Sequence, residues 1–280
     1  MTSAAPTALV WFKRDLRLRD HAPLTEAARF ERALALAVLE PQWLASPECH
    51  PRQVAYWLDA VHQLQVDLAA RGLPLLLRVG ALPQVLQDLR REVAFTHLFS
   101  HEETGPGWSW TRDRAVAAWC RAEGVAWTEW PQTGVLRRLR SRDGWAARWA
   151  ARMNAPRLPA PRGFAAPPGG AIQPAPLPTL RELGLPEPIA ALPPAGERAA
   201  WATLGDFLAG RGRGYRRALS SPLTAETGCS RLSEHLAFGT VSMRCVHQAT
   251  EARIRALNAN ANADPDPDSD PETDTDPALA

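Results

Sequence analysis

The sequence predicts an α/β protein, in which a five-stranded, parallel, doubly wound N-terminal domain is followed by a long linker and an incomplete all-α domain. Two observations predict this fold. Short apolar runs alternate with longer stretches of helical periodicity over the first half of the chain. A proline-rich stretch then leads to a second half with helical periodicity and no strand pattern. Alternating β and α units of this length favour a parallel sheet covered on both faces.

The elements of the first domain, residues 1–135, follow from these patterns. Strands are predicted at the apolar runs 8–12, 33–39, 74–79, 95–99 and 125–128, and helices at 51–71, 82–92 and 111–123. Gly72 and Gly124 stand where helices are expected to end, and each is followed by an apolar strand. No G-x-G-x-x-G or Walker A loop follows a strand, so an ordinary dinucleotide or nucleoside triphosphate site is unsupported.

The rest of the chain divides into three parts. Between residues 156 and 194 lie 12 of the 26 prolines, which predict an extended interdomain linker, placed at 136–195. The patterns at 196–210 and 230–257 predict the helical second domain, residues 196–257. Residues 258–280 alternate Asn, Asp and Pro with almost no apolar side chain, so we predict a disordered acidic tail.

Charge and composition bound the function. The net charge of +2 conceals an acidic tail, because residues 258–280 hold seven acids and no base, leaving 32 bases against 23 acids elsewhere. That basic body is compatible with DNA binding or with solubility alone. No apolar run approaches the roughly 20 residues of a membrane span, so we expect a cytoplasmic monomer. The four cysteines lie far apart, and we predict no metal site.

A charged segment follows the first predicted strand. Residues 11–21 read WFKRDLRLRDH, with bases and acids alternating at the carboxyl end of the strand. Open α/β sheets usually bind ligands at this edge. Two interpretations explain this pattern: the charges form ion pairs that hold a loop, or the bases form a site for an anion. The residues alone favour the ion-paired loop.

Two further segments carry candidate residues. After the fourth predicted strand comes HEETGPGWSW, in which Glu102 and Glu103 are either an acid and base pair or, more commonly for adjacent acids at a strand exit, solvated. The stretch 137–151 holds five arginines interleaved with Trp145 and Trp149. It predicts either stacking on nucleic acid or a helix that packs its tryptophans on the domain, and we favour the helix.

The most specific pattern lies in residues 213–244, which include RGY at 213–215, GCSRLS at 228–233 and FGTVSMR at 238–244. Cys229 and Ser230 predict the N-cap of a helix that starts near Arg231. The first amides of that helix, the hydroxyls of Ser230 and Ser233, and the charge of Arg231 suit a phosphate or pyrophosphate. An ordinary capped helix with its arginine in solvent explains these residues equally well.

Together these motifs resemble the DNA photolyase and cryptochrome family over residues 8–255, in the family's order. WFKRDLRLRDHAPL resembles the start of its five-stranded α/β domain, and GCSRLS followed by LAFGTVS resembles the segment that wraps the FAD pyrophosphate. Cys229 stands at a position where threonine is commoner in the family. The cysteine lacks the threonine hydroxyl, but its backbone amide is still available for a hydrogen bond. The resemblance implies FAD contacts from Tyr215, Cys229, Ser230, Arg231, Leu232 and Ser233.

The resemblance also implies a function. In this family FAD lies in the all-α domain. Blue light excites the reduced flavin, which passes an electron to a cyclobutane pyrimidine dimer flipped out of DNA, and the electron returns to the flavin when the dimer splits. We therefore expect a deoxyribodipyrimidine photolyase whose partner is UV-damaged DNA. A cryptochrome-type photoreceptor and a non-catalytic protein are the alternatives. A second antenna chromophore, a folate or deazaflavin, is implied near the fourth strand, with His101 and Glu102 as candidates.

The motifs leave the catalytic residues unassigned, because the family's flavin-ring helices have no counterpart in residues 1–280. We interpret the dipeptide repeats after Asn258 as the end of a truncated reading frame, and we expect weak flavin binding or none, with impaired activity. A partial helical domain is expected to expose the apolar side chains Leu232, Leu236, Phe238 and Val246.

Overall fold

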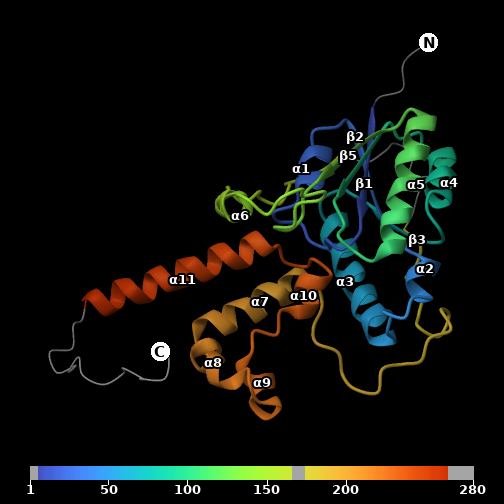
Figure 1. Ribbon diagram of the computed structural model, residues 1–280. Coiled ribbons are helices and arrows are strands. Elements are labelled where there is room, and N and C mark those ends of the chain that lie inside the picture. The colour runs from blue at the N-terminus through green and yellow to red at the C-terminus, as the bar shows by residue number, and fades with distance from the viewer. Residues whose placement is uncertain (1–5, 166–173, 264–280) are drawn as a thin grey trace.

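The computed structural model describes residues 6–165 and 174–263. Its centre is a parallel sheet of five strands in the order β3-β2-β1-β4-β5 (Figure 1). This confirms the predicted doubly wound α/β fold. The strands are β1 (Thr7–Phe12), β2 (Arg32–Leu39), β3 (Leu75–Val79), β4 (His97–His101) and β5 (Ala126–Trp130).

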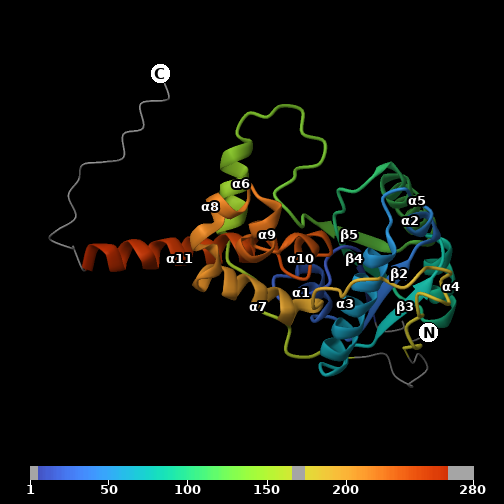
Figure 2. The same ribbon diagram turned by 90° about the horizontal axis from the view of Figure 1, so that it is seen from below.

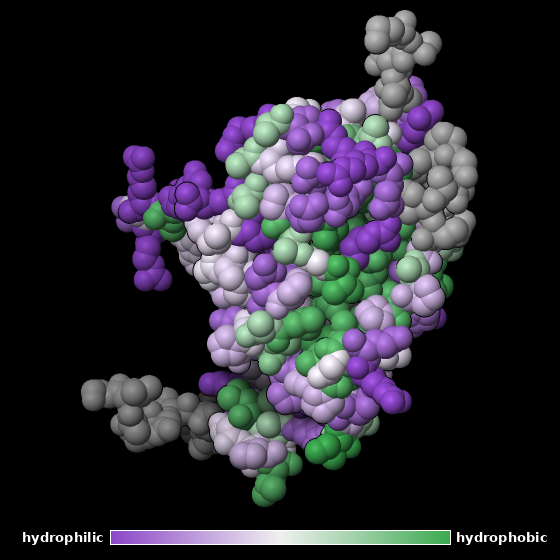
Figure 3. All heavy atoms as spheres, turned by 90° about the vertical axis from the view of Figure 1, so that its right-hand side faces the viewer, coloured by the Kyte–Doolittle hydropathy of each residue, from purple (hydrophilic) through white to green (hydrophobic). Residues whose placement is uncertain are grey.

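Helices cover both faces of the sheet because each central strand is apolar on both sides. Val10 and Phe12 of β1 pack in a core with helices α1 and α3, whereas Leu9 and Trp11 pack on the opposite face with α4 and α5. The view from the side of α4 and α5 shows hydrophobic residues gathered between hydrophilic patches (Figure 3). The helices of this domain are α1 (Ala22–Ala27), α2 (Pro41–Leu44), α3 (Pro51–Ala69), α4 (Gln84–Glu92) and α5 (Gly107–Glu123).

The three long helices lie where periodicity predicted them, whereas the short α1 and α2 were missed. Each of these two spans less than two turns, too short for a repeating apolar pattern. Proline at the first turn and the side chain of His21, which accepts a hydrogen bond from the amide of Leu24, define the start of α1 instead. Gly124 ends α5 in the left-handed conformation, as expected, with φ of 66°.

The segment between the domains contains a helix, α6 (Trp145–Asn154). Trp149 of α6 packs edge-on against His247, and Gln248 donates to the carbonyls of Met153 and Ala155. The tryptophans of the 137–151 stretch therefore lie on a helix, as the sequence analysis favoured. This helix packs on a helix of the second domain, however, and not on the first domain as expected. In the proline-rich part, Leu180 is buried against the α3 side of the core, while Gly169 and Gly170 lie outside the described residues.

The second domain is helical in the residues described. It comprises α7 (Gly196–Ala209), the 3-10 helix η1 (Arg211–Gly214), α8 (Tyr215–Ala218), α9 (Pro222–Gly228), α10 (Ser233–Ala237) and α11 (Met243–Ala263). The predicted continuous pattern at 230–257 is divided, because Gly239 adopts φ of 65° between α10 and α11. Both ribbon views show α11 running away from the sheet with α6 beside its N-terminal half (Figures 1 and 2).

Two predictions for the second domain are corrected. Helix α11 continues to Ala263, so residues 258–263 are helical and not disordered; Asn and Ala tolerate a helix that an upstream amphipathic segment has already nucleated. Leu232 and Phe238 are each 4% exposed, and Leu236 and Val246 are half-buried around a small core with Ala200. These four side chains are therefore covered by the helices present. No helix in the described ranges is long and apolar enough to cross a membrane.

Candidate functional site

The charged loop after β1 fastens the helical domain to the sheet. The amide of Leu16 donates to the carbonyl of Phe238 over 3.1 Å, and the buried guanidinium of Arg17 donates to the carbonyl of Gly239 over 3.0 Å. A Cβ on Gly239 would lie 2.6 Å from the Cα of Asp15. The FGTVS segment is therefore a docking element between the domains, and only glycine allows this approach.

A second set of bonds closes the same interface. Asp20, at the end of the loop, accepts from Ser242 Oγ over 2.6 Å and from Arg244 Nε over 3.0 Å. Burial opposes ionisation, but the hydrogen bonds from Arg244 and Ser242 hold the pKa of Asp20 below its usual range. Tyr56 of α3 bonds His235 Nδ1 over 2.8 Å. The alternating charges of residues 13–20 thus hold the loop in place through ion pairs and hydrogen bonds, which is the interpretation that the sequence favoured.

Asp15 is the buried centre of this loop. Its Oδ2 lies 2.7 Å from His101 Nδ1 and 3.0 Å from His21 Nε2, and its Oδ1 accepts from the amide of Lys13. Burial favours the neutral acid, yet the hydrogen bonds from the two histidines lower the pKa of Asp15 overall. Burial lowers the pKa of His101 to about 3 and also lowers that of His21. Both rings are therefore neutral at pH 7.

This group of one acid and two histidines has ligand atoms close enough for a metal ion, but its hydrogen bonds favour a structural role. His21 Nδ1 accepts from the amide of Leu24, so the proton of the neutral ring is on Nε2, which faces Asp15. A metal on Nε2 would place an N–H opposite the Leu24 amide. His101 bonds Asp15 through Nδ1 and is 2% exposed, so it belongs to this buried group, and its place beside a chromophore stays a prediction.

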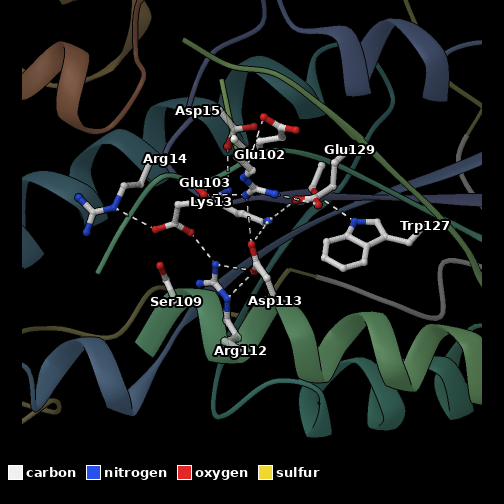
Figure 4. Close-up of polar contacts among 12 residues, drawn as sticks. Lys13, Arg14, Asp15, Glu102, Glu103, Ser109, Arg112, Asp113, Trp127 and Glu129 are labelled. Atoms are coloured by element: carbon white, nitrogen blue, oxygen red, sulfur yellow. Dashed lines mark hydrogen bonds and ion pairs between the residues drawn. The ribbon is translucent and has the colours of Figure 1, made fainter. Parts of the chain in front are cut away.

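An ion cluster crosses the carboxyl edge of β1, β4 and β5 (Figure 4). Lys13 lies 3.2 Å from both Asp113 and Glu129, while Arg112 pairs with Glu103 over 2.6 Å and with Asp113 over 2.8 Å. Glu103 is only 9% exposed, so solvation of both adjacent acids is a wrong prediction. Although β4 ends at His101, two residues before Glu103, the pairing with Arg112 keeps this carboxylate buried.

Arg112 is central to the cluster. Besides its two partners above, it lies 2.5 Å from Glu40, and its guanidinium is 4.8 Å from the ring centre of Trp11. Burial lowers the pKa of Arg112, but Glu103, Glu40 and Asp113 raise it above its ordinary value. Burial raises the pKa of Glu40 to about 7 despite the neighbouring guanidinium. Sequence reasoning missed Glu40, because it is a single acid directly after β2 and belongs to no motif.

The cleft beside this cluster is nearly filled. Its walls come from β1, α2, α3, α5 and the docking segment, and they leave a cavity of about 40 Å³. Pockets for cofactor-sized ligands are about 300–1,000 Å³. The cleft is lined by Trp11, Phe12, Lys13, Arg14, Val38, Glu40, Trp43, Trp57, Glu103, Trp108, Arg112 and Phe238.

The predicted cofactor residues lie together in the helical domain, with Cys229–Ser233 forming most of the turn between α9 and α10. The side chain of Arg211 in η1 bonds the carbonyls of Cys229 and Ser230, the latter over 3.2 Å. Tyr215 starts α8, is 41% exposed, and packs edge-on against Phe207 at 5.6 Å. Helix α8 itself packs on both η1 and α9.

The turn differs from the predicted cap. Helix α10 begins at Ser233 and not near Arg231; its N-cap is Leu232, which offers no side-chain acceptor. Arg231 adopts φ of 57°, a left-handed conformation that redirects the chain before the helix. As a result Leu232 is buried, whereas Arg231 and Ser233 are exposed.

The turn presents unpaired donors. Within the described residues, the backbone amides from Ser230 to His235 donate to no protein acceptor, and neither serine hydroxyl has a protein partner. Arg231 forms no ion pair there. Amides, hydroxyls and a guanidinium on one exposed turn are the donor set that binds a phosphate group.

Comparisons with known proteins find similar sequences. The model of the family described as DNA photolyase matches residues 8–138. A deoxyribodipyrimidine photo-lyase of Halobacterium salinarum is 31% identical over 270 residues, covering 87% of this chain and 54% of the relative. A cryptochrome DASH of Gloeobacter violaceus is 28% identical over 88% of this chain and 53% of the relative.

The fold also matches solved structures. The class III photolyase of Agrobacterium tumefaciens superposes with a TM-score of 0.75 at 24% identity, over 91% of this chain and 55% of that protein. The present chain thus spans about half the length of these relatives.

Proposed function

Because the chain belongs to the DNA photolyase family, we propose that it is a deoxyribodipyrimidine photolyase that binds FAD and acts on cyclobutane pyrimidine dimers in DNA. The observation that carries the proposal is the exposed turn at 229–233: the backbone amides of residues 230–233 and the hydroxyls of Ser230 and Ser233 have no protein partner in the described residues. Its position between two helices of the all-α domain, held by Arg211, is consistent with a site for the cofactor's phosphates.

The residues of this turn fit the phosphate end of FAD. Ser230 and Ser233 would donate hydroxyl hydrogen bonds and Arg231 would neutralise charge, while the side chain of Leu232 is buried. Cys229 contributes through its backbone, since its amide donates to Ala225 and its carbonyl accepts from Arg211. Tyr215 on the neighbouring α8 is exposed and supplies a further hydroxyl donor. When bound, FAD supplies the light-driven electron transfer of this family.

The chain's own residues then position this turn. Arg211 orients its carbonyls inward, so that the amides on the other side of the peptide planes face outward. The docking segment 238–242 fixes α10 on the sheet domain, which holds the turn at a constant place relative to the charged loop after β1. The basic body of the protein would attract DNA through its phosphates.

The central cleft does not fit a second chromophore. A folate or deazaflavin needs several times the roughly 40 Å³ that the aromatic walls leave. We therefore derive no role for such a group in this cleft.

Light-dependent repair tests the proposed function. With FAD in excess and a reductant present, we expect the purified protein to bind flavin weakly, as its absorption spectrum would show, and to remove thymine dimers from an oligonucleotide slowly in blue light and not in the dark. Flavin binding without repair would instead favour a cryptochrome-type photoreceptor, which the cryptochrome DASH relative makes the second candidate. Absence of flavin under these conditions would overturn both and favour a non-catalytic protein.

A further inference from the structure

We propose that the groove between α3 and the proline-rich segment 174–192 binds a linear aliphatic polyamine. The groove has a volume of about 840 Å³, within the range of pockets that hold small molecules. It reaches the amino edge of the sheet, because Gln65, which lines it, donates over 3.0 Å to the carbonyl of Leu75 at the start of β3. It shares no lining residue with the central cleft, and the proposal is independent of the FAD turn.

One wall of the groove is a side of α3. The lining residues come from successive turns of this helix, and they are Ala55, Leu58, Asp59, His62 and Gln65. Leu58 is 7% exposed and gives the wall an apolar base, whereas Asp59 and His62 are exposed. This wall therefore offers an apolar surface with one carboxylate beside it.

The opposite wall is the segment 174–192, which passes beside α3 in both ribbon views (Figures 1 and 2). Leu180 is 5% exposed and packs in the core on the α3 side of the sheet. Arg52, in the first turn of α3, donates to the carbonyl of Ala190 over 2.9 Å and to that of Ala191 over 3.3 Å. The segment is thus fastened to the first domain at two places, so the groove exists before any ligand binds.

The charges of the groove favour a cation. Asp59 lies on one wall and Glu187 on the other, and neither carboxylate forms an ion pair with another described residue. Among the described residues that line the groove there is no lysine or arginine. Four lining residues are prolines, which have a carbonyl acceptor but no N–H donor, namely Pro174, Pro176, Pro178 and Pro188. An ammonium group has three donors and no acceptor, so it complements these walls.

The lining favours an extended organic cation over a metal ion. The apolar side chains of Leu58, Leu177 and Leu192 line the groove together with the two acids. Within the part of the chain that the structure describes, these acids belong to no group of three ligands close enough to hold a metal ion. A linear polyamine consists of ammonium groups joined by methylene chains. Its charges suit the two carboxylates, and its methylene groups suit the leucine and proline side chains.

Spermidine is the probe, and its binding to the purified chain is measured by equilibrium dialysis at low ionic strength, where exposed carboxylates are least screened. We expect saturable binding that weakens about threefold in Asp59→Asn or in Glu187→Gln and about tenfold in the double variant, since each exposed ion pair contributes little. Glu31→Gln with Glu48→Gln is the matched control, because both side chains are exposed and form no ion pair in the described residues. This control leaves the affinity unchanged.

A series of linear diamines of increasing length, each compared with the monoamine of equal length, tests whether both walls bind the ligand. The ratio of the two affinities passes through a maximum at the length where the diamine reaches both carboxylates. That maximum is lost in Asp59→Asn and in Glu187→Gln, because each variant leaves only one carboxylate in the groove.

Three results would overturn this site. The first is no saturable binding of spermidine to the wild-type chain. The second is equal affinity in wild type and in Asp59→Asn with Glu187→Gln, which would assign the polyamine to the seven acids of residues 258–280. The third is a ratio of diamine to monoamine affinity without a maximum, which would indicate attraction by net charge alone. None of these results bears on FAD binding, so the two proposals fail separately.

Discussion

Replacing Gly239 by alanine is expected to lower the free energy of unfolding by at least about 3 kcal/mol, within the range of severe steric and backbone substitutions. The new Cβ would collide with the carbonyl of Arg14 and lie 2.6 Å from the Cα of Asp15, both backbone atoms that cannot turn aside. The left-handed φ of 65° adds strain. Urea denaturation measures the change.

The matched control is the same substitution at Gly205, which lies inside α7 with no atom near its missing Cβ. Alanine there is expected to stabilise the protein by about 0.5–1 kcal/mol, because glycine is unfavourable inside a helix. Equal effects at the two glycines would contradict the role of Gly239 as the point where the domains meet.

Replacing Arg112 by methionine is expected to destabilise the protein by about 3–5 kcal/mol at neutral pH, because it leaves the buried carboxylates of Glu40, Glu103 and Asp113 without their guanidinium. Arg29→Met, which breaks an exposed ion pair, is the control and is expected to change stability by less than about 0.5 kcal/mol.

The loss depends on pH with a definite sign. Burial raises the pKa of Glu40 to about 7, and Arg112 restrains that rise, so the variant raises it further. An acid with a raised pKa contributes stability that is fully present below its unfolded pKa and is lost as pH rises through the folded value. Below about pH 7 both proteins keep the Glu40 proton and lose stability together, so the difference between wild type and Arg112→Met opens as the pH rises above about 7. Urea midpoints from pH 5 to pH 8 measure it, and a difference that shrinks above pH 7 would contradict this role of Glu40.

The fold could be predicted because its determinants are local. Strands β1 and β2 are unbroken apolar runs after their first residue, and helices α3, α4 and α5 are long enough to show periodicity. The short helices α1 and α2 depend on proline and on single caps, which leave little pattern. The sequence analysis ended the last helix too early, before Asn258. Composition indicates only the propensity of these residues, whereas α11 is nucleated upstream and extends through them to Ala263.

The site was predicted in part. The turn at 229–233 presents free donors as expected, but its helix starts later because Arg231 takes a left-handed conformation, which no residue pattern announces. The FGTVS segment, which the resemblance grouped with the segment around the FAD pyrophosphate, also joins the two domains, and nothing in the residues pointed to that contact. Glu40 and Arg112 meet across 72 positions of sequence, and such a contact has no local signal.

Titration of the purified chain with FAD tests the central claim most directly, which is that the turn at 229–233 holds the cofactor's phosphates. Ser230→Ala with Ser233→Ala is compared with Ser220→Ala with Ser221→Ala, an equal loss of hydroxyls in the same helical domain. The account predicts weak, saturable FAD binding that the first pair weakens about tenfold, in keeping with lost hydrogen bonds to a charged group, and that the second pair leaves unchanged. Equal affinity in the two double variants, or no FAD binding to the wild-type chain, would contradict it.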